Sequence, residues 1–208
     1  MSGLELDHVL IAVTDLDEAA AELEARHGLA STVGGRHPGW GTANRIVPLG
    51  DTYLELVAVV DESEVGGSAF GPWVAAGAGP GLGRPLGWAV RTTNLDELAG
   101  RLGLTVIAGS RVHPDGGTVR WRAAGGEQAV AEPAFPFFLE WAAGTVLPGR
   151  APAAHRAGAV ALTGLRLTGD AARLAHWLGR HELPLSVAPG PPAVAAVVLR
   201  SDAGEIVL

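Results

Sequence analysis

Two histidines lie in turns of nearly the same sequence, HPGWGT at residues 37–42 and HPDGGT at residues 113–118. Pro fixes φ and Gly supplies backbone conformations that other residues avoid, so both segments are turns. His37 and His113 are therefore either solvated turn residues or groups that contact a substrate, and both interpretations stay open. The repeated turn also raises the question of whether the elements around it are duplicated.

Two residue types that often carry chemistry are missing. The 208-residue chain has no cysteine, which excludes disulfides, thiolate metal sites and a cysteine nucleophile. It has no lysine, which excludes Schiff-base chemistry and a phosphate-binding loop lysine. The absence of cysteine fits a reducing compartment, and we expect a cytoplasmic protein.

The composition indicates a compact protein of short elements and many turns. Apolar residues make up 48% of the chain, which also contains 30 Gly and 14 Pro. The net charge is −7 and no basic run occurs, so we expect no nucleic-acid partner. The N-terminal sequence MSGLELDHVLIAV has no basic leader, and we expect neither a signal peptide nor a membrane partner.

The chain matches itself at an offset of 79 positions. Residues 8–23, HVLIAVTDLDEAAAEL, align with residues 87–102, GWAVRTTNLDELAGRL, as an apolar strand followed by a helix. Asp15 and Asn94 stand at the expected N-caps, each followed by acidic residues.

The match continues beyond the helix at changing offsets. GTANRIVPLG aligns with GTVRWRAAGG at an offset of 76, and TYLELVA at residues 52–58 aligns with FFLEWAA at 137–143 at an offset of 85. Loops absorb such length changes at little cost. We therefore predict two βαβββ modules.

The predicted organisation has four parts. The first module spans residues 4–60, a Gly-rich linker 61–84, the second module 85–145, and a C-terminal extension 158–208. The extension reads as a degenerate third module. Its elements are a strand near 160–167, a helix near 170–181, and strands near 194–200 and 205–208.

The paired modules resemble the vicinal oxygen chelate superfamily, in particular its glyoxalase-like branch. The resemblance covers roughly residues 4–145 and rests on LDHVLIAVTDLDEA, GGRHPGWGTANRIVPLGDTYLELVA, GWAVRTTNLDELAGRL and PFFLEW. It implies an α+β fold of the glyoxalase, bleomycin-resistance and dioxygenase type. In that fold, paired βαβββ modules form a curled mixed sheet whose concave face holds a divalent metal.

The resemblance also implies a metal site. The four metal positions of the superfamily fall on His8, Glu55, Gly87 and Glu140. Three of these residues can bind Ni, Zn, Fe, Mn or Mg, whereas Gly87 cannot, so the site could also hold no metal. In the superfamily's enzymes the metal stabilises an enediolate or a similar anion while a carboxylate moves a proton. That catalytic role would fall to Glu140 or Glu55.

Strand alternation is compatible with these positions. His8 shares a face with Leu10 and Ala12, opposite a wholly apolar face that a helix would cover. Glu55 and Glu140 each sit between apolar residues two positions away, where a carboxylate is costly unless it has a partner.

A structural alternative needs no metal. Arg91 shares the face of Gly87 and could form a buried ion pair with both glutamates. Arg91 is also a candidate for substrate binding. The candidates for lining the pocket that are chosen by position alone are Asn44, Trp88, Arg120 and Trp121. The six tryptophans are equally compatible with a structural core.

Two functions follow from these predictions. The first is a metal-dependent lyase, isomerase or dioxygenase that acts on a small oxygenated substrate through His8, Glu55 and Glu140. The second is a metal-free protein that binds a small molecule, similar to the drug-binding resistance proteins of the superfamily. The expected partner is a small-molecule ligand, and a homodimer is compatible with either function.

Overall fold

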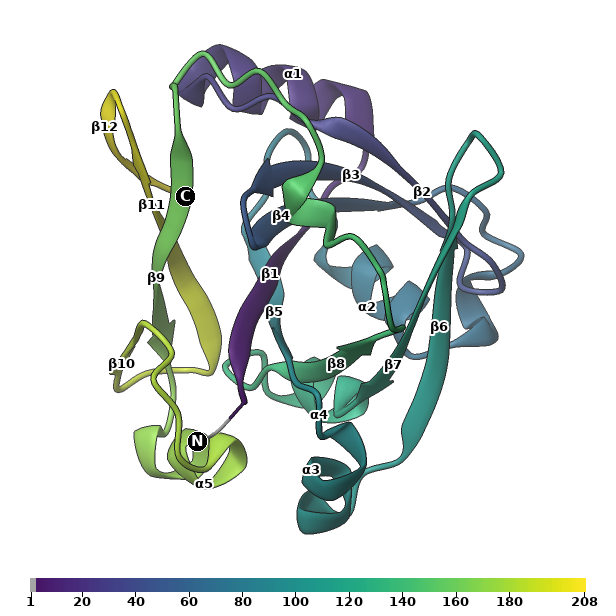
Figure 1. The fold of residues 1–208 in the computed structure, drawn as a ribbon, viewed down its shortest axis with the longest axis vertical. Coiled ribbons are helices and arrows are strands. Elements are labelled where there is room, and N and C mark those ends of the chain that lie inside the picture. The colour runs from purple at the N-terminus through teal and green to yellow at the C-terminus, as the bar shows by residue number, and fades with distance from the viewer. Residues whose placement is uncertain (1–2) are drawn as a thin grey trace.

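The computed structural model describes residues 3–208, which form a mixed α+β fold with two β-sheets (Figure 1). Eight strands within residues 5–141 close into a barrel, and four strands within residues 160–207 form a separate sheet beside it. The predicted α+β class and curled sheet are therefore confirmed. The sheet curls far enough to close on itself.

The first half of the barrel contains β1 (Glu5–Ala12), α1 (Leu16–His27), β2 (Thr32–His37), β3 (Thr42–Leu49) and β4 (Thr52–Val59). Helix α1 begins after Asp15, whose side chain accepts hydrogen bonds from the backbone N–H groups of the first turn. It ends at Gly28, which has a φ of 68°. Strand β4 pairs in parallel with β1 and antiparallel with β3.

The second half contains β5 (Pro85–Arg91), α3 (Leu95–Leu102), β6 (Val106–Val112), β7 (Thr118–Ala124), α4 (Gly126–Ala131) and β8 (Phe137–Trp141). Strand β8 pairs in parallel with β5 and antiparallel with β7. Antiparallel pairing of β1 with β5 joins the two halves on one side. The order around the barrel is β1-β4-β3-β2-β6-β7-β8-β5.

The two faces of the barrel wall have different neighbours. In β1, the side chains of Val9 and Ile11 join the large core on the outside of the barrel, where α1 contributes Leu23. Leu10 and Ala12 point to the inside. This alternation places every second residue of each strand toward the barrel interior.

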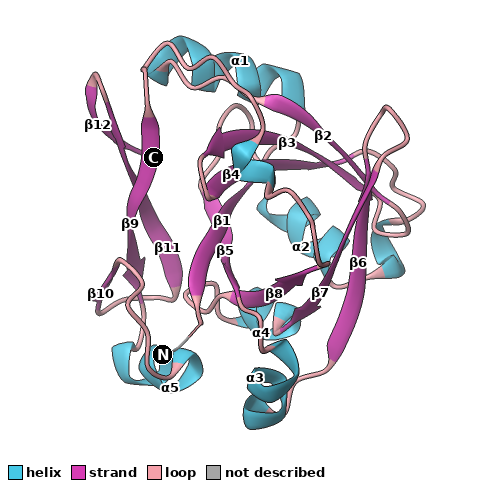
Figure 2. Ribbon diagram, in the orientation of Figure 1, coloured by secondary structure: helices cyan, strands magenta, loops and turns pink. Residues whose placement is uncertain are grey.

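The separate sheet contains β9 (Val160–Thr168), α5 (Ala171–Leu178), β10 (Leu185–Ala188), β11 (Ala193–Ser201) and β12 (Gly204–Val207), after a short 3₁₀ helix, η2 (Pro148–Arg150). The strand order is β10-β9-β11-β12. Figure 2 shows this sheet beside β1 and β5, with α1 at one end of the molecule and α3 and α5 at the other. Leu165 and Val197 belong to the same core as Val9 and Val90, so the sheet buries the outer face of the barrel.

The segment predicted as a Gly-rich linker, 61–84, contains helical structure. It forms a short 3₁₀ helix, η1 (Val65–Gly67), and the helix α2 (Phe70–Gly77). Trp73 and Val74 of α2 pack against Leu10 and Val57 inside the barrel. The segment joins the two halves of the barrel, and its apolar residues fold back into the barrel interior. Within residues 3–208, no helix combines the length and the apolar character needed to cross a membrane.

The barrel closes on its other side at a narrow seam between β2 and β6. Only one residue pair, Arg36 with Val112, joins these strands. Gly35 makes this approach possible, since a Cβ atom at this position would lie 2.2 Å from the carbonyl oxygen of Val112. The glycine is required by the close contact of two backbones.

Gly35→Ala is expected to destabilise the protein by roughly 2–3 kcal/mol, because the added methyl group forces β2 away from β6. Chemical denaturation measures this loss. Gly66→Ala is the matched control, since nothing lies within 4 Å of the added Cβ there. Equal stability of the two variants would contradict a tightly closed seam.

Candidate active site inside the barrel

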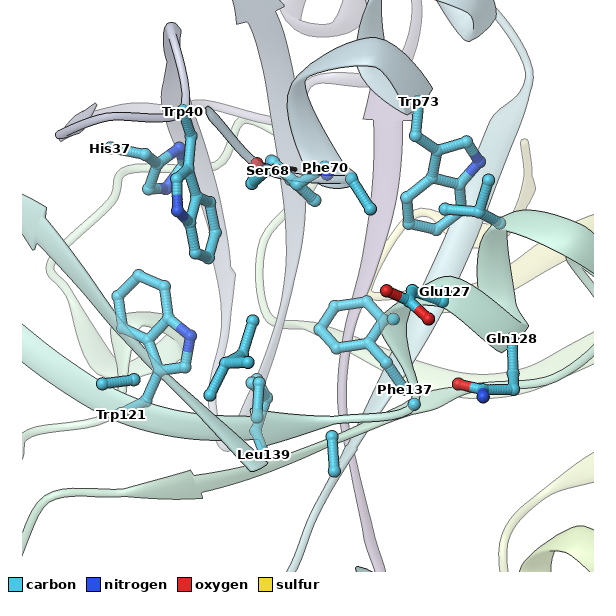
Figure 3. Close-up of a pocket in the computed structure, with 18 of the residues that line it drawn as sticks. His37, Trp40, Ser68, Phe70, Trp73, Trp121, Glu127, Gln128, Phe137 and Leu139 are labelled. Atoms are coloured by element: carbon cyan, nitrogen blue, oxygen red, sulfur yellow. Dashed lines mark hydrogen bonds between the residues drawn. The ribbon is translucent and has the colours of Figure 1, made fainter. Parts of the chain in front are cut away.

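The inward-facing side chains enclose a cavity of about 590 Å³. Seven aromatic side chains line it: Trp40, Tyr53, Phe70, Trp73, Trp121, Phe137 and Trp141. The Trp40 ring centroid lies 5.4 Å from that of Phe70 and 6.1 Å from that of Trp121. Figure 3 shows these rings with Phe137 and Trp73 around one space, with Glu127 at its edge. A cavity of this size and character suits a small organic molecule.

A buried array of three ionisable residues lies in this part of the barrel. His8 Nδ1 lies 2.7 Å from Asp7 Oδ1, and His8 Nε2 lies 3.2 Å from Glu55 Oε2. None of the three is more than 5% exposed. The His8 ring stacks on Tyr53 with a centroid distance of 4.6 Å, which fixes its orientation. Of these residues, His8, Tyr53 and Glu55 line the cavity.

A β-bulge brings Asp7 to this array. The pairing of β1 with β5 shifts between Leu6 and His8, so Asp7 is left out of the ladder. Simple alternation would point Asp7 away from His8. The bulge instead allows its carboxylate to contact His8 and to accept a hydrogen bond of 2.8 Å from Trp141 Nε1.

A second histidine reaches the same carboxylate from β2. His37 Nδ1 lies 2.8 Å from Thr42 Oγ1, and His37 Nε2 lies 3.8 Å from Glu55 Oε1. Asn44 Nδ2 donates a hydrogen bond of 2.6 Å to Glu55 Oε1. The polar atoms therefore converge on Glu55, and the HPGWGT turn supplies both His37 and Thr42.

The contacts within this array shift the pKa values of His8 and Glu55 in opposite directions. Burial alone would lower the pKa of His8, but its hydrogen bonds with Asp7 and Glu55 outweigh burial and raise the pKa to about 9. Burial alone would raise the pKa of Glu55, but the contacts with His8, His37 and Asn44 lower it to about 2. At neutral pH the pair consists of an imidazolium and a carboxylate.

His37 and Tyr53 are held in their neutral forms. Burial lowers the pKa of His37 to about 4, although the charge of Glu55 opposes this effect. Burial and the nearby charges of Asp7 and Glu55 raise the pKa of Tyr53 well above its ordinary value. The cavity therefore contains one protonated and one neutral imidazole beside the same carboxylate.

The structure does not bring Glu140 to this site. Its carboxylate pairs with Arg122 on the outside of the barrel, and Arg122 also binds Asp96. The reason is the strand register. Leu10 pairs with Glu55 in the first half, whereas Ala89, which aligns with Leu10 at the offset of 79, pairs with Phe137. Phe137 is thus the counterpart of Glu55. The odd displacement from Phe137 to Glu140 reverses the face.

The residues at the superfamily's metal positions do not fit a four-ligand site. Trp73 fills the space beside Gly87, where a Cβ would lie 2.4 Å from Cη2 of its ring. Glu140 points outward, and both ring nitrogens of His8 already contact carboxylates. Within residues 3–208, no group of three or more His, Asp or Glu side chains is arranged to hold a metal ion.

Four predicted substrate-binding residues lie outside the cavity. Trp88 is fully buried in the outer core, and its indole donates to the carbonyl of Ala134. Arg91 pairs with Glu5 and approaches Asp7 at 3.7 Å, so it is not the partner of Glu55 or Glu140. Arg120 faces the outer surface beside Trp121, and His113 lies in the β6–β7 hairpin beside Asp115.

His37 and Asn44 are the predicted substrate-binding residues that do line the cavity. Trp121, a candidate pocket residue by position, lines the cavity as well. The residues that the sequence did not predict for the site are Asp7, Tyr53, Arg111 and the other aromatic residues of the wall. Tyr53 could have been found, since it shares a strand face with Glu55. Asp7 could not, because nothing in the sequence marks the bulge.

Several solved structures are similar to this chain. A hypothetical protein from Staphylococcus aureus matches with a TM-score of 0.72 at 14% identity, over 95% of this chain and 91% of that one. Methylmalonyl-CoA epimerase from Mycobacterium tuberculosis matches with a TM-score of 0.45 at 22% identity, over 65% of this chain and 85% of that one. No curated protein sequence matches the chain significantly.

The family model for a glyoxalase-like domain matches residues 6–182, which include all of the barrel except its first residue, together with β9 and α5 of the second sheet. This range contains both the Asp7–His8–Glu55 array and the cavity walls. The chain therefore belongs to the glyoxalase-like domain family, as its resemblance to the vicinal oxygen chelate superfamily predicted.

Proposed function

We propose that the protein binds a small oxygenated organic molecule in the barrel cavity and transfers a proton on it through His8 and Glu55. The observation that carries this proposal is the buried imidazolium–carboxylate pair, which faces a largely apolar cavity. Buried charges of this kind are costly for stability and are concentrated at functional sites.

The pair has the two groups needed to convert a carbonyl compound into its enol. The Glu55 carboxylate takes the proton from a carbon next to the carbonyl, and the electrons of the broken C–H bond form the new double bond. His8 gives its proton to the carbonyl oxygen. Glu55 then returns its proton to the other face of this carbon, and the enol O–H group returns its proton to His8, which restores the carbonyl and both catalytic groups. The product is an isomer, so the reaction class is isomerase.

Substrate binding would also make Glu55 a stronger base. The contacts with His8, His37 and Asn44 outweigh burial and lower the pKa of Glu55 to about 2, and a low pKa weakens a base. A carbonyl oxygen that takes the hydrogen bond of His8 Nε2 removes the contact with His8. The pKa of Glu55 then rises because less of the effect of its burial is compensated. Asp7 keeps His8 oriented through Nδ1.

A second function, binding without chemistry, is favoured by the aromatic wall. Five or more rings around one space suit the sequestration of a flat molecule, as in the binder predicted from the sequence. The two functions differ in what happens to a bound ligand.

Deuterium exchange separates these functions. A panel of small 2-oxo acids, hydroxyketones and aryl ketones is incubated with the protein in D₂O, and NMR follows both binding and loss of the C–H signal. The proposal expects at least one bound compound to exchange its proton faster than in buffer. Compounds that bind without any exchange would support the binder instead.

A further inference from the structure

One arginine is buried in the wall of the cavity. Arg111 lies on β6 and is 8% exposed, and it is the only buried arginine within residues 3–208. It faces inward together with Ile107. The glycine at position 35 leaves room for its stem, since a Cβ there would lie 2.9 Å from Arg111 Cγ.

The Arg111 guanidinium has no acidic partner. Its Nε atom is buried without a hydrogen-bond partner, and none of the ion pairs within the described part of the chain involves it. By contrast, the half-buried Arg91 binds Glu5, and Arg122 binds two carboxylates. A buried cation without a partner costs several kcal/mol unless a ligand supplies the missing charge.

Arg111 lines the same cavity as His8 and Glu55, the two residues of the proposed proton transfer. Its charge acts on His37, whose pKa it helps to lower, and on Tyr53 beside the array. Arg111 and Glu55 both line the cavity, so one small ligand can contact the guanidinium and still reach Glu55. The rings of Trp40 and Trp121 line the same cavity.

We propose that Arg111 binds the carboxylate of an aromatic carboxylic acid whose ring lies among the cavity's aromatic side chains. This inference rests on the proposed function and names its substrate class. A guanidinium binds a carboxylate through two parallel hydrogen bonds, which also fixes the orientation of the ligand. The anion supplies the partner that the protein itself does not.

A structural role for Arg111 makes different predictions. Asp7, His8 and Glu55 together carry one excess negative charge when His8 is protonated, and Arg111 could balance this charge from a distance. In that case removal of Arg111 would lower stability. If Arg111 instead serves to bind a ligand, the substitution Arg111→Met should leave the melting temperature of the protein unchanged or raise it.

The test uses cinnamate and cinnamamide, a flat aryl carboxylate and its neutral amide. Calorimetry or ligand-detected NMR gives the Kd of each for the wild type, Arg111→Met and Arg36→Gln. Arg36 is the matched control, because it lies across the seam from β6 but is exposed and paired with Asp61.

The wild type is expected to bind cinnamate at least tenfold more tightly than cinnamamide. Arg111→Met should abolish this preference with unchanged amide affinity and an undiminished melting temperature, while Arg36→Gln should retain it. Equal wild-type affinities, binding of neither probe, or a destabilised Arg111→Met would overturn the inference. Solvent exchange of another compound from the panel would then still leave the proposed proton transfer standing.

Discussion

Glu55→Gln is expected to slow the proposed proton exchange by about 10²–10⁴-fold, the range typical of a lost general base. The amide cannot accept the substrate proton, although it has the size of the carboxylate and can still accept the hydrogen bond from Asn44. The measurement is the rate of deuterium incorporation under saturating ligand, with the fold checked by circular dichroism.

The same substitution has a readout that needs no ligand. Two of the contributions that raise the pKa of His8 to about 9 come from Glu55, so Glu55→Gln should lower this pKa. NMR titration of the His8 ring measures the change. Glu140→Gln is the matched control, since Glu140 pairs with Arg122 outside the barrel. A similar loss of exchange in both variants, or an unchanged His8 pKa, would contradict the assigned role of Glu55.

Stability is expected to be greatest near pH 6.5 and to fall on both sides. On the alkaline side, the folded protein holds the His8 proton up to about pH 9, whereas the unfolded chain releases it near 6.5. The contribution of His8 is therefore fully present below pH 6.5 and is lost as the pH rises through 9. The loss amounts to roughly 1.4 kcal/mol per pH unit, or about 3 kcal/mol in total.

On the acid side, two buried groups resist protonation. The pKa of His37 is about 4 in the folded protein and 6.5 when exposed, so the unfolded chain binds a proton first as the pH falls. The pKa of Glu55 is lowered from 4.5 to about 2, and its contribution is lost below pH 4.5. Both effects favour the unfolded chain at low pH.

Chemical denaturation between pH 4 and 9.5 tests this profile. His8→Gln should flatten the alkaline limb, and His37→Gln should flatten the acid limb down to about pH 4, whatever their effect on the maximum. Stability that rises between pH 7 and 9 in the wild type would show that His8 is not held as an imidazolium.

The sequence alone was sufficient for the features that depend on neighbouring residues. The Asp15 N-cap predicted the start of α1, and Gly28 supplies its left-handed end. Alternation assigned the side chains of His8 and Glu55 each to the inner face of its strand. This agrees with the resemblance that put them in one site, and the structure has them 3.2 Å apart. These features are local, because helix caps and strand faces are set within a few residues.

The register between distant strands was decided only by the tertiary structure. The alignment of FFLEWAA with TYLELVA pointed Glu140 inward, but the pairing of Ala89 with Phe137 points it outward. The bulge at Asp7 likewise depends on how β1 meets β5. A shift of an odd number of residues reverses the face of every side chain on a strand, and nothing within a single strand specifies that shift.

The cavity also depended on contacts that no local pattern reveals. Trp73 comes from a segment that reads as a linker, yet it packs against Leu10 and occupies the space beside Gly87. Arg111 packs against Gly35 at the β2–β6 seam, and the two strands of this seam are about 75 residues apart in the sequence. The sequence thus determined the family and the His8–Glu55 pair. Long-range packing determined which other side chains surround that pair, because their positions depend on how distant segments meet.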